Sequence, residues 1–537
     1  MPKKKRQKAA KKNIEADNKK SFQESINKFF EFKYLGIVLG LVYFLILTIV
    51  SVAYHKVGDY GVETDFFWGY VPEAKHFING SVKIDAFRGP LYPIVLGIST
   101  LITSDYFYSG MFIGIISATL SIILSFGLLK RIFSPAIAFF TILIVAANPI
   151  FVQYTYSAGT DMFFNLLAVS TLFFFFREKE LDYKFLVLAG IMAGLSYLTR
   201  YNGVFLVGFV VVILFVNYRG IKWIQRIKAS LIFLGVFILT FSPWGFYCLS
   251  EKGSFFYNEN YKNIAYELFG KGKVSWDQFW FEQSSNYTSL FDVVSRDFTL
   301  FISTVIGNIG ENFMLDMERL TGWHTGAFVI LGLVLLIISK PWKRISTREI
   351  GYYLVNIFFF GLLLLVFYSE RFSLFLLPFY TLLAVQPFFS SNFKFMKKLP
   401  STIAYLVPII LLTVTLSQSI SFNGKRIDSG PQELLILRDW YEENITENER
   451  GTKIAARKAH VAYYLDMEFS LIPMAKNYEE LISQLKQSGV DYLYFSTMEA
   501  AMRRELQFLL NPNQNHPGLK PVVYFENPPA VLYKLTE

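Results

Sequence analysis

Residues 34–54 read YLGIVLGLVYFLILTIVSVAY, a run of 21 residues without a charged side chain. A helix needs about 20 apolar residues to cross the hydrocarbon core of a bilayer. The run is therefore long enough to span a membrane. It is followed by the polar stretch ETDFFWGYVPEAKHFINGS at residues 63–81. Apolar runs separated by polar connections recur along the chain, and this alternation decides its class.

The composition agrees with that interpretation. Of the 537 residues, 53% are hydrophobic and 18% are charged, and the mean hydropathy is +0.36. Average soluble domains are about 45–50% apolar and about 25% charged, so an ordinary soluble enzyme is excluded. The single cysteine, Cys248, excludes an intramolecular disulfide and a Cys-rich metal site. The five histidines have no metal-ligand spacing, so we expect no histidine-built metal site.

Eleven apolar segments are candidate spans: 34–54, 109–129, 135–152, 161–176, 184–199, 202–217, 229–249, 324–339, 350–368, 372–389 and 401–420. Cytoplasmic connections of membrane proteins carry an excess of Lys and Arg. With a cytoplasmic N-terminus, the connections on that side are 130–134, 177–183, 218–228, 340–349 and 391–400, and each contains Lys or Arg. We therefore predict a multi-pass protein of the cell membrane with its C-terminus outside.

Residues 1–33 form a basic tail, with eleven Lys or Arg and four acids. Such a run is also typical of an arm that binds nucleic acid. The long apolar segment directly after it favours a cytoplasmic tail in front of a membrane span. We therefore expect contact with membrane lipids and none with nucleic acid.

Two apolar segments are not counted as spans. Residues 90–102 are only 13 in number, and we interpret them as a juxtamembrane or re-entrant helix on the outer side. Residues 298–320 have mixed polarity and are expected to lie along the membrane surface. They belong to two long outer loops, 55–108 and 250–323, of a membrane domain that covers residues 34–420.

Residues 421–537 have a different composition, with 29 charged residues in 117. This fraction is close to that of soluble proteins. A helix is predicted over 479–489, and strands are predicted over 452–456, 491–495, 521–525 and 530–535. The sequence thus predicts an all-α polytopic membrane protein with a small extracytoplasmic α/β domain at its C-terminus.

Several ionisable residues fall in separate connections on the predicted outer side. They are Glu63, Asp65 and Asp85 in the first loop, Asp161 at the start of a span, Arg200, and the neighbours Glu370 and Arg371. A carboxylate can accept the proton of an attacking hydroxyl, and an arginine can bind a phosphate with two hydrogen bonds. The pattern favours an outward-facing cleft that transfers a sugar from a lipid phosphate to an acceptor hydroxyl.

Five stretches resemble the membrane-embedded GT-C glycosyltransferases, in particular the branch of the protein mannosyltransferases and the lipid A aminoarabinose transferases. They are ETDFFWGYVPEAKHFINGS (63–81), FRGPLYPIVLG (87–97), NPIFVQYTYSAGTDMFFNLL (148–167), GLSYLTRYNGVFLV (194–207) and ERFSLFLLP (370–378). The resemblance covers about residues 34–420. It implies a GT-C fold, a polyprenyl-phosphate sugar donor, inversion at the anomeric carbon and no cofactor.

The resemblance also implies roles for individual residues. Asp65 would take the proton of the acceptor hydroxyl or orient that hydroxyl, and Asp161 would be a second carboxylate of the cavity. Arg200 and Arg371 would hold the donor phosphate. Family members often have two adjacent acids in the first loop, whereas Thr64 separates the two acids here, so Glu63 remains an alternative to Asp65.

Other questions stay open at this point. The acceptor is a lipid, a glycan or a protein, and the sugar is not identified. Binding of a divalent cation is an alternative role for the carboxylates, although the resemblance implies no metal. A secondary transporter or a lipid-linked sugar flippase is the alternative function, but the span interiors are almost free of charge, unlike those of most transporters. A non-catalytic envelope assembly protein is a third hypothesis.

Overall fold

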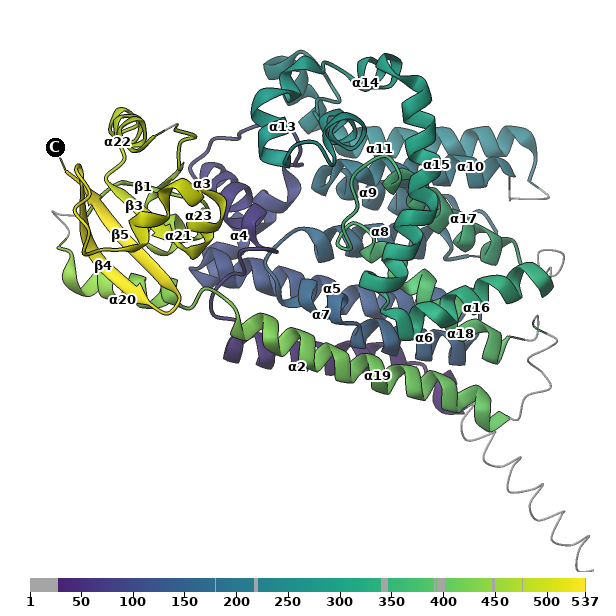
Figure 1. Ribbon diagram of the computed structural model, residues 1–537. Helices are drawn as coiled ribbons and strands as arrows, with labels where there is room; N and C mark the ends of the chain where they lie inside the picture. Colours follow the sequence, from purple (N-terminus) through teal and green to yellow (C-terminus); the bar gives the residue numbers. More distant parts are fainter. Residues whose placement is uncertain are drawn as a thin grey trace, which may run out of the picture.

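The computed structural model of the protein contains a bundle of helices with a small sheet domain at one end (Figure 1). It describes residues 28–178, 180–216, 221–339, 346–390, 393, 401–446, 450–475 and 477–536. Most of the predicted basic tail and of the connections 340–349 and 391–400 lies outside these residues.

Each predicted span is helical over most of its length. The helices are α2 (Leu35–Tyr54), α5 (Tyr106–Ile132), α6 (Pro135–Ala147) with α7 (Pro149–Tyr156), α8 (Asp161–Phe175), α9 (Tyr183–Thr199), α10 (Val204–Val216), α11 (Trp223–Lys252), α16 (Trp323–Ser339), α17 (Thr347–Leu363), α18 (Leu377–Phe389) and α19 (Ser401–Asp428). Of these, α2, α5, α11 and α19 are long and apolar enough to cross a membrane alone. Because most of the others are shorter, the count of eleven spans stays a prediction.

The bundle is built around α5. This helix packs against α2, α6 and α8, and α8, α9 and α11 follow as successive neighbours. On the other side, α18 packs against α6 and α16. The outer face of α2 presents large apolar side chains, among them Leu41, Leu45 and Ile49, each more than half exposed. An apolar surface of this kind is what a lipid-facing helix requires.

The predicted span 135–152 is bent rather than straight. Its two parts, α6 and α7, meet at an angle of 63°. Pro149 has no backbone N–H to continue the first helix, and it restricts the preceding residue to an extended conformation. Asn148 adopts that conformation and accepts hydrogen bonds from the N–H groups of Ile150 and Phe151, which starts the second helix. The predicted span is therefore a bent helix pair, whose two parts are together long and apolar enough to cross a membrane.

Shorter elements connect the bundle helices on the side of the predicted outer loops. They are the π-helical turn η1 (Phe66–Tyr70), α3 (Val71–Ile78), α4 (Leu91–Thr103), α12 (Tyr261–Ala265), the π-helical turn η3 (Tyr266–Gly270), α13 (Trp276–Glu282), α14 (Leu290–Arg296), α15 (Phe298–Leu315), the π-helical turn η5 (Asp316–Leu320) and the 3-10 turn η7 (Leu374–Leu376). The segment Phe298–Leu320 is long enough to cross a membrane. Figure 1 shows α15 running across the direction of α10 and α11. That this segment lies along the membrane surface stays a prediction.

The C-terminal domain is a five-stranded mixed sheet with short helices. Its elements are α20 (Glu433–Asn444), β1 (Lys453–Ala456), α21 (His460–Tyr464), β2 (Glu468–Leu471), α22 (Tyr478–Gln487), β3 (Tyr492–Ser496), α23 (Thr497–Met502), β4 (Leu519–Glu526) and β5 (Pro529–Leu535). The strand order is β2-β1-β3-β5-β4, with β1 parallel to β2 and β3 and the remaining pairs antiparallel. The predicted helix and four strands are present, and β2 is an additional strand.

Chemical labelling tests the predicted orientation. Ser429 follows α19, and Ser346 precedes α17; both are exposed. In a Cys248→Ser background, a cysteine at Ser429 is expected to react with a membrane-impermeant thiol reagent on intact cells. A cysteine at Ser346 is expected to react only after the membrane is broken. The reverse pattern would place the C-terminal domain in the cytoplasm.

Candidate active site

Charged side chains from five separate segments meet where α8 begins and α9 ends. Asp161 is the first residue of α8, and Arg200 directly follows α9 in an extended conformation. Asp65 precedes η1, Arg88 lies in the connection before α4, and Arg371 lies in the turn between α17 and η7. The four residues predicted for the transfer reaction, other than Glu63, are therefore brought together, and Arg88 joins them.

Arg371 connects the two aspartates of the cluster. Its Nη1 and Nη2 atoms each lie 3.2 Å from Oδ2 of Asp65, and its Nε lies 3.5 Å from Oδ1 of Asp161. Arg200 donates a hydrogen bond from Nη1 to the same Oδ1 atom. Removing one partner from a buried ion pair leaves an uncompensated charge, which is strongly destabilising. The four side chains are thus coupled, and each depends on the others for its position.

Arg88 extends the cluster on the side of the first loop. Its Nη2 lies 3.3 Å from Oδ1 of Asp65, and its Nη1 lies 3.0 Å from Oδ2 of Asp85. Two glycines permit close packing here, one beside the Arg88 side chain and the other beside the backbone at the end of α9. A Cβ at Gly69 would lie 2.6 Å from Nη1 of Arg88, and a Cβ at Gly89 would lie 1.9 Å from the carbonyl oxygen of Leu198. Arg88 was not among the predicted site residues, although its segment was, because the sequence does not show which carboxylate it contacts.

Asp65 is the most accessible member of the cluster. Its side chain is 42% exposed, compared with 8% for Asp161 and 21% for Arg371. Desolvation alone would raise the pKa of Asp65, but the charges of Arg371 and Arg88 outweigh this effect and lower the pKa to about 2. Asp65 is therefore ionised at neutral pH. It remains a weak base for as long as both arginines face it.

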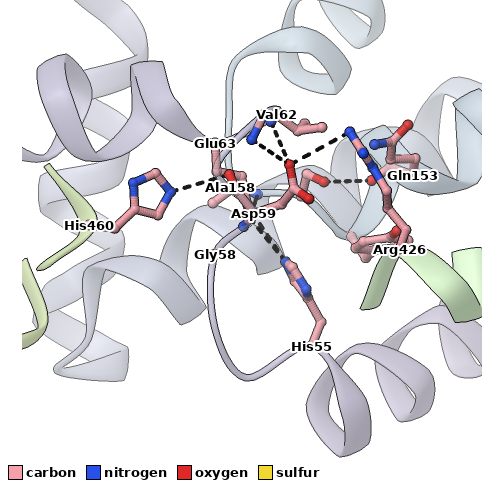
Figure 2. A network of polar contacts seen from close by, with 12 residues as sticks. His55, Gly58, Asp59, Val62, Glu63, Gln153, Ala158, Arg426 and His460 are labelled. Carbon is pink, nitrogen blue, oxygen red and sulfur yellow. Dashed lines mark hydrogen bonds and ion pairs between the residues drawn. The ribbon is translucent and has the colours of Figure 1, made fainter. Parts of the chain in front are cut away.

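Glu63 occupies a different environment from Asp65. Its side chain is fully buried, and it accepts hydrogen bonds from the backbone N–H groups of Asp59 and Ala158. His55, at the end of α2, places Nε2 3.2 Å from Oε2 of the same carboxylate. Figure 2 shows Glu63 enclosed by these groups. The side chain thereby connects the first loop to the segment that leads into Asp161, and it is shielded from solvent.

Asp316 supports Arg371 from the side of α15. This carboxylate is fully buried at the start of η5, and it accepts hydrogen bonds from the hydroxyl groups of Tyr380, at 2.8 Å, and Tyr368, at 3.1 Å. The two tyrosines lie on either side of the turn that carries Arg371. The sequence analysis did not single out Asp316, because its partners are 52 and 64 residues away.

The carboxylates of the cluster face arginines rather than one another. Among the residues that the structure describes, no group of three or more His, Cys, Asp or Glu side chains is arranged to hold a metal ion. The site therefore suits an anion better than a cation, because guanidinium groups supply most of its charged hydrogen-bond donors. That the reaction needs no metal stays a prediction.

Part of the sequence that contributes to this site is similar to a known protein family. The profile of the dolichyl-phosphate-mannose-protein mannosyltransferase family matches residues 88–247. This range contains Arg88, Asp161 and Arg200. The sequence matches no curated protein at a significant level.

Solved structures share the fold over nearly the whole chain. The apo crystal structure of ArnT from Cupriavidus metallidurans has a TM-score of 0.59 and 12% sequence identity, covering 93% of this chain and 97% of that protein. ArnT bound to undecaprenyl phosphate has a TM-score of 0.56 and 13% identity, covering 94% and 98%. The oligosaccharyltransferase AglB from Archaeoglobus fulgidus, in complex with an inhibitory peptide and a dolichol-phosphate, has a TM-score of 0.55 and 15% identity, covering 86% and 70%.

These matches confirm the resemblance to the GT-C superfamily of glycosyltransferases. Together with the apolar helices, they identify the chain as an integral membrane protein with that fold. Identities of 12–15% establish the fold alone. The reaction and its substrates are therefore argued from the site.

The burial of Glu63 predicts a structural role for it. Glu63→Ala leaves the N–H groups of Asp59 and Ala158 without an acceptor, and each costs about 1–3 kcal/mol. We expect a clear loss of thermal stability in detergent, measured by the unfolding of the purified protein. Glu63→Gln retains one acceptor oxygen and is expected to be less destabilised. Equal stability of wild type and Glu63→Ala would contradict the role.

Proposed function

We propose that the protein is a membrane glycosyltransferase that moves a sugar from a polyprenyl-phosphate donor to an acceptor hydroxyl on the outer face of the cell membrane. The observation that carries the proposal is the cluster of Arg88, Arg200 and Arg371 around Asp65 and Asp161. Support comes from the shared fold, because ArnT was solved with undecaprenyl phosphate and AglB with a dolichol-phosphate.

The arginines supply the binding site for the donor phosphate. Arg200 and Arg371 meet at Asp161, and their guanidinium groups lie near the ring of Phe372, with carbon Cζ 5.5 Å and 5.6 Å from its centroid. A phosphate that enters between them exchanges ion pairs with aspartate for charge-assisted hydrogen bonds with its own oxygens. Asp161 then orients both arginines from the buried side of the site.

Asp65 is the proposed proton acceptor. When the phosphate draws Arg371 toward itself, the pKa of Asp65 moves up from about 2 toward its ordinary value, so Asp65 becomes a better base. The acceptor oxygen forms a bond with the anomeric carbon, and its proton passes to Asp65. The bond from the anomeric carbon to the phosphate oxygen breaks, and polyprenyl phosphate leaves with that electron pair. Attack from the face opposite the phosphate inverts the anomeric configuration.

Glu63 does not fit the role of base, because it is fully buried and its oxygens already accept hydrogen bonds. Of the two acids in the first loop, we therefore propose Asp65 as the base. The acceptor hydroxyl belongs to a lipid, a glycan or a protein, and the cytoplasmic N-terminus and outer C-terminal domain are part of the proposal. A secondary transporter or a lipid-linked sugar flippase is the alternative, and it is separated from a transferase by whether a new glycosidic product forms.

Carboxamide variants test the assignment of the base. Asp65→Asn is nearly isosteric but cannot accept the proton, so turnover is expected to fall roughly 100-fold or more. Asp161→Asn is expected to impair transfer as well, because both arginines lose a charged partner. Transfer is measured in membranes supplied with a polyprenyl-phosphate sugar, and protein abundance is measured in parallel.

The comparison with Glu63→Gln is the control for this experiment. Glu63→Gln is expected to lower transfer only as far as it lowers the amount of folded protein, so that turnover per folded molecule stays close to that of the wild type. Loss of transfer in Glu63→Gln but not in Asp65→Asn would assign the base to Glu63. Donor movement across the membrane without any glycosidic product in the wild type would favour the transporter.

Lysine variants test the phosphate site. Arg200→Lys and Arg371→Lys keep the positive charge but lose the planar pair of donors. Loss of a charge-assisted contact costs about 1.5–3 kcal/mol, so we expect the KM for the donor to rise by about 10-fold to 100-fold. Arg296→Lys is a matched control, since Arg296 pairs with Asp292 on α14, outside the site. Unchanged kinetics in both site variants would remove these arginines from the donor site.

A further inference from the structure

The C-terminal domain contacts the loop that carries Asp65 through polar groups of one short segment. The N–H of Gly58 donates to the hydroxyl of Tyr464 at 3.0 Å, and Nε2 of His460 lies 3.2 Å from the carbonyl oxygen of Asp59. Nζ of Lys458 donates to Oγ1 of Thr64 at 2.7 Å. Helix α21 and the residues just before it therefore hold both ends of the segment 58–64.

The same helix encloses the loop with aromatic side chains. The ring of Phe67 lies 4.3 Å from that of His460 and 4.8 Å from that of Tyr463, measured between centroids. Tyr60 contacts His460 at 4.8 Å. Phe67 is only 3% exposed, and it shares one hydrophobic core with Val461 of the domain. The loop and the domain are thus packed as one unit.

His460 acts in this contact as a neutral group. Burial lowers its pKa to about 3, although the hydrogen bond to the Asp59 carbonyl opposes that shift. Because a carbonyl oxygen can only accept, Nε2 carries the hydrogen and donates it. Figure 2 shows His460 approaching the loop from the opposite side to Arg426, which lies 3.7 Å from the Asp59 carboxylate. Asp59 is therefore held by a group on α19 and by a group on α21.

These contacts surround Asp65 without touching its carboxylate. Thr64 precedes it and is held by Lys458, and Phe67 follows within η1 and is held by α21. The carboxylate itself faces Arg371 and Arg88. The position of its backbone, and so the direction in which it meets an acceptor, depends on groups of the C-terminal domain.

We propose that α21 and Lys458 form a positioning element for Asp65, so that transfer requires the C-terminal domain to be docked on the first loop. The inference rests on the proposed function, because it takes Asp65 as the proton acceptor. It gives the domain a role in catalysis without placing any of its residues in contact with the reacting atoms.

Variants of Tyr464 and Lys458 test the proposal, with a variant of Tyr463 as the control. Tyr464→Phe removes the acceptor of the Gly58 N–H, and Lys458→Met removes the donor to Thr64. Tyr463→Phe is the control on the same helix, because its hydroxyl contacts α5 and the residue that caps it instead of the loop: it accepts from the N–H of Phe107 and donates to Asp105. Amide hydrogen exchange of the full-length protein is measured over residues 57–67, together with kcat and KM of transfer.

Tyr464→Phe and Lys458→Met are expected to speed exchange in this loop by about tenfold, the effect of losing one hydrogen bond. They are expected to lower kcat while leaving the KM for the donor unchanged, and Lys458→Arg is expected to restore both exchange and kcat. Tyr463→Phe should change neither. The proposal is overturned if loop exchange and kcat of Tyr464→Phe and Lys458→Met match those of the wild type. It is also overturned if Tyr463→Phe changes loop exchange and kcat by the same amount.

The exchange measurement separates this inference from the proposed function. If wild type transfers no sugar but the variants still loosen residues 57–67, the domain holds the loop and the assignment of catalysis fails. If wild type transfers sugar and the loop-contact variants transfer it at the same rate, the positioning role alone fails.

Discussion

The guanidinium group of Arg371 holds the two aspartates of the site together. It contacts both carboxylates, that of Asp65 from the first loop and that of Asp161 from the start of α8. Charges are costly next to a hydrocarbon phase unless they are paired. The pairing therefore makes it possible for carboxylates to lie at the ends of apolar helices. It also leaves the arginines with partners that an anion can replace.

Two fully buried carboxylates outside the ion-pair cluster support this arrangement. Glu63 joins the first loop to Ala158, three residues before Asp161, and Asp316 joins η5 to both sides of the turn that carries Arg371. Neither is neutralised by a guanidinium group. Glu63 is satisfied by backbone N–H groups and a histidine, and Asp316 by tyrosine hydroxyls. Hydrogen bonds of this kind stabilise an ionised carboxylate and give it one orientation.

The sequence predicted the positions of Asp65, Asp161, Arg200 and Arg371 because long apolar helices confine charge to their ends. It did not predict their pairing, since the partners are up to 306 residues apart. It also kept Glu63 as an alternative to Asp65, because two residues of the same charge in one loop differ only in what surrounds them after folding. The roles of Arg88 and Asp316 and the strand β2 depend likewise on distant contacts. The bend before Pro149 is a local effect that hydropathy does not register.

The contact between α21 and the first loop also determines when the protein becomes complete during synthesis. Gly58 and Tyr464 are separated by 406 residues, so the first loop gains this partner only after a long further stretch of chain has been made. All the bundle helices after α2 are made in that interval. A chain stalled between α19 and α21 therefore contains every charged residue of the site but no partner for its first loop.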